Sequence, residues 1–203
     1  MLGLATVFGF VTGGTFSLFV NLRRTASLRR PPFGVLEDRV HGLARFSLPP
    51  GWRPASALNE GSALQAIDPL RSRYVLVISS SRENYEALMD LTEYSERTRA
   101  TFVTWPRRVL GIRGPDQRRV DGFRALQYEI DVSADLTLMT FLHTTIEGQR
   151  AFHQVIAWAV RSTYDRQAFE RLLDGFSEVP GPHPRPLAIE TSPLAASAGR
   201  SVH

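Results

Sequence analysis

The stretch that most constrains the fold runs from residue 123 to 160, where apolar side chains alternate with other residues over three successive runs. These runs cover residues 126–132, 136–146 and 152–160. Alternation with period two is typical of β-strands that bury one face. The breaks Ser133-Ala134-Asp135 and Glu147-Gly148-Gln149 have the length and composition of tight turns, and we expect a positive φ at Gly148. The sequence therefore predicts an antiparallel meander of three strands.

Further elements surround the meander. Strands are predicted at residues 45–48, 63–67 and 73–79, and a hairpin within residues 107–119 that turns at Gly114-Pro115-Asp116. A helix begins at the capping-box-like Asp90-Leu-Thr-Glu93 and stops at Pro106. A final helix presents its apolar stripe between Phe169 and Phe176, and the stretch Ser162-Thr163-Tyr164-Asp165 before it supplies capping candidates.

A chain of 203 residues with 43% hydrophobic residues is long enough for one sizeable core. The absence of cysteine excludes disulfides, thiol catalysis and a lipid-modified N-terminal cysteine. We predict a membrane anchor (1–21), a basic linker with prolines (22–34), one α+β domain (35–179) and a Pro-rich disordered tail (180–203).

Residues 1–20 contain no charged side chain and have about the ~20 residues that a transmembrane helix needs. Small residues recur at every fourth position, at Ala5, Gly9, Gly13 and Ser17, and this ridge could pack against another membrane helix. The arginines that follow the segment would hold the domain in the cytoplasm, if Met1 is the true start. The alternative is that the segment is a core helix of the folded domain.

All 24 basic residues are arginine. Four of them lie in residues 1–30 without any acid, whereas the remaining 20 are balanced by 20 Asp and Glu. The predicted domain is therefore neutral overall, and bulk attraction to phosphate backbones is weak. We predict no nucleic-acid partner.

Charge is nevertheless segregated between residues 82 and 124, where acids come first and arginines follow. The predicted hairpin would gather Arg107, Arg108, Arg118 and Arg119 into a patch for an acidic partner or for anionic lipid headgroups. The alternative, which we favour, is that the acidic helix start and the basic strands neutralise each other or face water.

Candidate catalytic and metal-binding residues are few. His143 and His153 fall on neighbouring strands and could lie opposite each other, but two histidines without a third ligand make a weak metal site. Glu129 and Asp131 alternate onto one strand face, which a solvated face explains better than paired catalytic carboxylates. No nucleophile-elbow or phosphate-binding glycine motif is present. We predict no catalytic, cofactor-binding or metal-binding residue.

Several motifs together resemble the PsbP-like fold over residues 42–178. They are Phe46-Ser-Leu-Pro-Pro-Gly-Trp52, Asp90-Leu-Thr-Glu-Tyr94, Val120-Asp-Gly-Phe-Arg-Ala125 and the closing amphipathic helix. This family includes a photosystem II accessory protein, a Ran-binding nuclear import factor and DcrB-type bacterial envelope lipoproteins. The resemblance implies an α/β/α sandwich, an antiparallel sheet with flanking helices, and a role in binding or assembly. It also implies an extracytoplasmic domain, so the side of the membrane stays open.

The expected function is that of a non-catalytic, membrane-tethered binding or assembly-accessory module with a protein partner and no cofactor. One alternative is a small-molecule carrier with an apolar pocket lined by residues such as Phe102, Phe141 and Trp158. A less favoured alternative is a hydrolase or isomerase with a site around Tyr128, Glu129, His143 and His153.

Overall fold

The computed structural model describes residues 35–38, 42–56, 58–59, 61–85, 89–103, 108–134 and 137–180, apart from the side chains of 101–103. The predicted membrane anchor with Ala5, Gly9, Gly13 and Ser17, the linker, and nearly all of the predicted tail lie outside these residues. Within the described ranges, no helix combines the length and the apolar character needed to cross a membrane.

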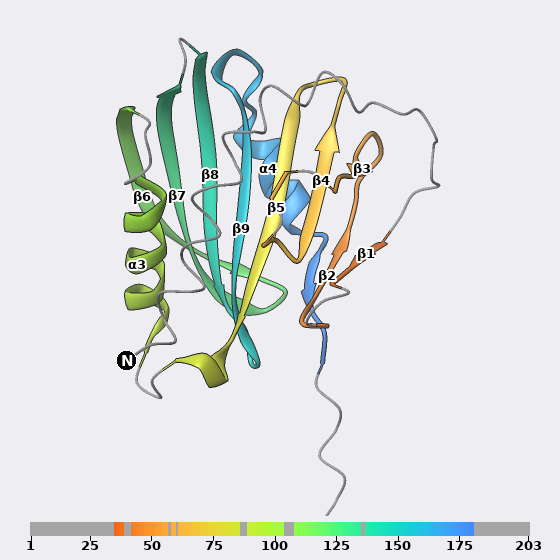
Figure 1. Ribbon diagram of the computed structural model, residues 1–203, viewed down its shortest axis with the longest axis vertical. Coiled ribbons are helices and arrows are strands. Elements are labelled where there is room, and N and C mark those ends of the chain that lie inside the picture. Colours follow the sequence, from red (N-terminus) through yellow and green to blue (C-terminus); the bar gives the residue numbers. More distant parts are fainter. Residues whose placement is uncertain are drawn as a thin grey trace, which may run out of the picture.

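Seven strands form one antiparallel sheet in the order β3-β4-β5-β9-β8-β7-β6 (Figure 1). They are β3 (Arg53–Pro54), β4 (Leu64–Asp68), β5 (Arg73–Ser81), β6 (Arg108–Val120), β7 (Phe123–Ala134), β8 (Thr137–Glu147) and β9 (Ala151–Val160). The predicted meander is confirmed as β7-β8-β9, and β5 completes a sheet centre that is apolar on both faces.

Glycine at position 148 has a different structural cause from the positive φ suggested by the sequence. Gly148 is not among the residues with positive φ. A Cβ at this position would lie 2.3 Å from the Glu178 carboxylate oxygen and 2.9 Å from the Ala151 carbonyl oxygen. Glycine is required here by the close approach of a carboxylate to the backbone rather than by turn geometry.

The predicted hairpin within residues 107–119 was also wrong, because β6 runs without reversal from Arg108 to Val120. The Gly114–Pro115 peptide is cis, Gly114 has φ 109°, and the register shifts between Arg113 and Asp116. One extra residue therefore bulges out of β6 while pairing with β7 continues. The true reversal is the two-residue turn Asp121-Gly122, with φ values of 52° and 79°.

The two faces of the large sheet are covered differently. The helix α3 (Leu91–Val103) packs over β7 and β8 on one face. The other face carries the helix α4 (Arg166–Leu173) and a small sheet of β1 (Val35–Glu37), β2 (Ala44–Ser47) and β10 (Phe176–Glu178). Short 3₁₀ turns η1 (Arg82–Asn84) and η2 (Arg161–Thr163) follow β5 and β9. The α+β class with an antiparallel sheet and flanking helices is confirmed.

Each face has its own apolar core. On the α4 side, Phe169, Leu172 and Leu173 pack with Phe46 and Phe176 of the small sheet. Among the predicted capping candidates, Asp165 caps α4, because its carboxylate accepts a hydrogen bond of 3.1 Å from the Ala168 N–H. On the α3 side the core is built from Tyr128, Ile130, Phe141, Ile156 and Trp158, among others.

Candidate partner-binding site

A pocket of about 380 Å³ lies between the first turn of α3 and the β6–β7 hairpin. We call it the arginine pocket. It is lined by Leu91, Thr92, Gln117, Arg118, Arg119, Arg124, Ala125 and Leu126. Arg119 and Arg124 are exposed, and the register places both on the α3 face of the sheet, with Glu147 of β8 directly opposite Arg124.

The hairpin turn explains why two arginines meet here. A two-residue turn at Asp121-Gly122 pairs Val120 with Phe123 and, one step further, Arg119 with Arg124. Like charges directly opposite each other on adjacent strands are unfavourable. Arg124 lies 3.4 Å from Glu147 on β8, but among the described residues Arg119 donates only to the Gly122 carbonyl, at 2.8 Å. The pocket therefore keeps an excess of positive charge.

The helix adds to this potential. The Asp90 carboxylate accepts a 2.8 Å hydrogen bond from the Glu93 N–H, and the Asp90 carbonyl accepts from Tyr94 at 3.0 Å. The N–H groups of Leu91 and Thr92, at the pocket wall, belong to the first turn, which has no intrahelical acceptors. The positive end of the helix dipole lies beside two guanidinium groups, and an anionic group is favoured there.

The structure does not gather the four arginines of the predicted patch. Arg107 lies outside the described residues, and Arg108 is at the far end of β6. Arg118 and Arg119 are neighbours in the strand and point to opposite faces, so that Arg118 lies 3.8 Å from Glu170 of α4. Of the three described arginines, Arg119 alone presents its side chain on the α3 face at the pocket. A binding role for the others stays a prediction. The Asp121-Gly122 dipeptide was the sequence signal that could have identified Arg124 as the cross-strand partner of Arg119.

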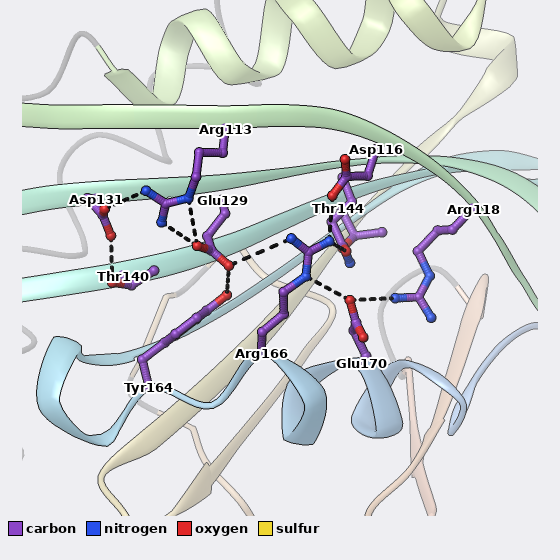
Figure 2. Close-up of polar contacts among 11 residues, drawn as sticks. Arg113, Asp116, Arg118, Glu129, Asp131, Thr140, Thr144, Tyr164, Arg166 and Glu170 are labelled. Atoms are coloured by element: carbon purple, nitrogen blue, oxygen red, sulfur yellow. Dashed lines mark hydrogen bonds and ion pairs between the residues drawn. The ribbon is translucent and has the colours of Figure 1, made fainter.

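On the α4 face, a set of ion pairs that we call the charged cluster joins β6 and β7 to α4 and to Tyr164 (Figure 2). Its centre is Glu129, which accepts hydrogen bonds from Arg113 and, at 2.7 Å, from the Tyr164 hydroxyl. Asp131 accepts from Arg113 at 2.9 Å and from Thr140 at 2.7 Å. Arg166 contacts Glu129, Asp116 and Glu170.

The expectation that Glu129 and Asp131 form a solvated face was therefore wrong. Asp131 is 5% exposed, because α4 and η2 cover this part of the sheet. Burial opposes ionisation of Asp131, but the hydrogen bonds from Arg113 and Thr140 outweigh it and hold its pKa below the ordinary value. Burial and the bond to Glu129 raise the pKa of Tyr164. The cluster pairs its carboxylates with its own arginines and holds α4 on the sheet.

The two strand histidines lie on opposite faces. His143 pairs with Ile156 and His153 pairs with Ile146, so the proposed proximity for a shared metal was wrong. No group of metal-ligating side chains occurs in the described part of the chain. Burial lowers the pKa of His143 to about 4, although Gln154 lies 3.3 Å from its Nε2 atom.

The same register separates the residues of the hydrolase or isomerase alternative. Tyr128 and His143 are paired on the α3 face, whereas Glu129 and His153 point to the α4 face. Tyr128 donates to Glu96, and burial followed by this bond raises the pKa of Tyr128 to about 12. These four residues do not share one site.

A serine, a histidine and a glutamate that sequence analysis did not connect do meet on the α4 face. The His153 ring contacts the Ser79 hydroxyl at 2.9 Å and the Glu178 carboxylate at 3.2 Å. The same carboxylate accepts from the backbone N–H groups of residues 149–151, at 2.8–3.0 Å. Since His153 and Glu178 are buried, the arrangement ties β10 to the β8–β9 turn.

Two of the side chains in the predicted carrier pocket fill the core instead. Phe141 and Trp158 are buried and stack with ring centroids 5.7 Å apart, and Tyr74 stacks on Trp158 at 5.3 Å. The side chain of Phe102 lies outside the described set. Both faces of the Trp158 ring thus have aromatic neighbours in the folded domain.

No protein-family model matches the chain. No curated protein is similar to it in sequence. Solved structures are similar in fold at low identity. PsbP of Synechocystis sp. PCC 6803, CyanoP, has a TM-score of 0.51 at 15% identity, covering 75% of this chain and 98% of that one.

Two weaker likenesses have TM-scores below one half. LpqN of Mycobacterium tuberculosis, involved in cell envelope biogenesis, gives 0.49 at 15% identity over 75% of this chain and 88% of that one. The Ran-binding protein Mog1p of Saccharomyces cerevisiae gives 0.46 at 14% identity over 72% and 95%. The order of elements and the likeness to cyanobacterial PsbP confirm the resemblance in the sequence: this chain has the PsbP-like fold.

Proposed function

We propose that the chain is a non-catalytic accessory module that binds an acidic segment of a protein partner at the arginine pocket. The observation that carries this proposal is the directly opposed pair Arg119 and Arg124 at the rim of a pocket of about 380 Å³. An acidic side chain or a C-terminal carboxylate that enters the pocket would relieve the repulsion between the two arginines and gain charge-assisted hydrogen bonds.

The rest of the described chain supports binding over catalysis. The charged cluster uses its carboxylates in ion pairs, and the Ser79–His153–Glu178 contact lies in the protein interior. The fold is shared with a PsbP protein, and the family that the motifs resemble acts by binding and assembly. The alternative function as a carrier of a small apolar molecule is not favoured, because the rings of Phe141 and Trp158 stack on each other.

A membrane tether through residues 1–20 is part of the proposal. The segment has no charge and a length suited to a transmembrane helix. Tethering raises the effective concentration of the domain near a membrane complex, so that a pocket with two arginines would suffice for specific docking. The side of the membrane on which the domain lies is left open.

Photocrosslinking tests the pocket directly. A photoreactive phenylalanine derivative replaces Thr92, which is exposed at the pocket, in cells that produce the protein. We expect one predominant protein adduct that carries an acidic segment. The same substitution at Val35, 55% exposed in the small sheet, should not give this adduct.

Charge reversal supplies the control. Arg119→Glu with Arg124→Glu should abolish the adduct, whereas Arg45→Glu, at an exposed arginine paired with Glu37, should retain it. An adduct that survives reversal at the pocket would show that the arginines do not carry binding. A lipid adduct in place of a protein would contradict the protein partner.

A further inference from the structure

One end of the large sheet exposes leucines on three separate elements. Leu70 lies in the β4–β5 turn and is 84% exposed, Leu110 near the start of β6 is 45% exposed, and Leu138 near the start of β8 is 43% exposed. The pairings Arg108 to Ser133 and Ser133 to Leu138 place the starts of β6 and β8 at the same end. Figure 1 shows the β4–β5 turn and the β9–η2 connection at this upper end.

Arginines accompany these leucines. Arg108 and Arg161 are exposed at the same end, at the start of β6 and just after β9. Among the described residues, neither arginine takes part in an ion pair, and Arg161 feels only the charge of Asp131, which Arg113 already binds. Arg71, beside Leu70, is paired with the buried Asp68 at 3.1 Å. Counted over the residues that the structure describes, this leucine–arginine end therefore carries a positive excess.

We propose that the leucine–arginine end rests on an anionic lipid surface. The strands from β4 to β6 span about 24 Å at an interstrand spacing of about 4.8 Å, so the leucines protrude singly across a wide edge. A protein partner needs a continuous complementary patch, whereas a lipid interface accepts isolated apolar side chains at the headgroup boundary and places phosphates beside arginines.

This contact would set the orientation of the domain. The arginine pocket adjoins the β6–β7 turn, which Figure 1 shows at the opposite, lower end of the sheet. A domain that stands on the leucine–arginine end presents the arginine pocket away from the bilayer. The inference uses the membrane that the proposed tether supplies, but depends on different residues from the tether and from the pocket.

Site-specific fluorescence tests this contact, because the chain has no cysteine. The full chain with Leu70→Cys, Leu138→Cys or Thr92→Cys is labelled with an environment-sensitive dye and reconstituted with vesicles of phosphatidylcholine, with or without phosphatidylglycerol. Nitroxide-labelled lipid should quench the dye at 70 and 138, and not at 92, when phosphatidylglycerol is present. Arg108→Gln with Arg161→Gln should lower the ratio of docked to undocked label about 30-fold.

Quenching that is equal at 70 and 92, or missing at 70, would overturn the inference. Equal quenching at 70 on both lipid compositions would overturn the part played by the arginines. Flotation of the same samples separates this result from the tether. If the protein floats on phosphatidylcholine while label 70 stays unquenched on anionic vesicles, the tether stands and the docking contact fails. If it floats only on anionic vesicles with label 70 quenched, the tether fails and the docking contact stands.

Discussion

The two charged sites of this domain differ in how far the fold neutralises them. In the charged cluster, Asp116, Glu129, Asp131 and Glu170 each contact at least one of Arg113, Arg118 and Arg166. In the arginine pocket, two arginines are direct cross-strand neighbours, and among the described residues Arg119 has no carboxylate partner. A site that satisfies its own charges contributes to stability, whereas an excess of one sign is available to a partner.

The helices that pack over the two sites, α4 and α3, cause this difference. The helix α4 brings Arg166 and Glu170 over the sheet, so charges of both signs meet around the largely buried Glu129. At the pocket, α3 presents its first turn, whose backbone N–H groups add positive potential, while its own carboxylates Asp90 and Glu93 bind the Glu93 N–H and Arg97 rather than the pocket arginines. Substitutions in the charged cluster should therefore change stability, and substitutions in the pocket should change binding.

The largest effect is expected for Asp131→Asn. This change removes one of the two carboxylates that hold Arg113 and leaves a buried amide beside Thr140, and we expect a loss of about 3 kcal/mol in the free energy of unfolding. The matched control Asp116→Asn, at a side chain 55% exposed, should cost less than about 1 kcal/mol. Urea denaturation of both variants gives the comparison, and equal losses would refute a buried, structural cluster.

On the α3 face, the pH dependence of stability tests the burial of His143. The pKa of His143 is lowered to about 4 from 6.5, so the folded state disfavours the proton that the unfolded state accepts. Stability from this group is complete above pH 6.5 and is lost as the pH falls toward 4, by about 3 kcal/mol in total.

The variant His143→Gln provides the control for that titration. It removes the titrating group from a buried position, so the slope of unfolding free energy between pH 6.5 and 4 should flatten. An unchanged slope would assign the acid sensitivity to another group. Chemical denaturation at several pH values measures both proteins.

The sequence predicted elements that local chemistry controls. The period-two runs of the meander and the Asp165 cap of α4 depend on neighbouring residues only, and both are confirmed. The faces of His143 and His153 depend on the register, and a shift of one residue moves a side chain to the other face. Glu129 and Asp131 are shielded from solvent because α4 and Tyr164 pack over them. These contacts are distant in the sequence, so no local pattern could predict them.

The arginine pocket was only half predictable for a similar reason. Arg119 was singled out from its place in a run of basic residues, but its partner is fixed by the turn at Asp121-Gly122. The predicted reversal at Gly114 would have paired different residues. In the structure Gly114 lies too close to the Gln127 carbonyl, 2.5 Å from an ideal Cβ, for any larger residue.

A smaller effect separates the half-buried Tyr164 from the buried Tyr128. Tyr164→Phe removes the hydroxyl that donates to Glu129 within the charged cluster, and should cost about 2 kcal/mol of unfolding free energy. Tyr128→Phe removes a similar bond to Glu96, a carboxylate that is 44% exposed and already paired with Arg99, and should cost about half as much. Thermal unfolding ranks the two variants, and a reversed order would contradict the dominance of the charged cluster.

The smallest effect, and the opposite sign, is expected at the pocket itself. Arg119→Gln removes one of two like charges and only one hydrogen bond, to the Gly122 carbonyl, so stability should stay constant or rise by up to about 0.5 kcal/mol. Added salt should shrink the gain, because it screens the repulsion that the substitution removes. Urea denaturation at low and high salt measures both quantities. A loss above about 1 kcal/mol would make Arg119 a structural residue like those of the charged cluster, and the pocket would then have no surplus charge to offer a partner.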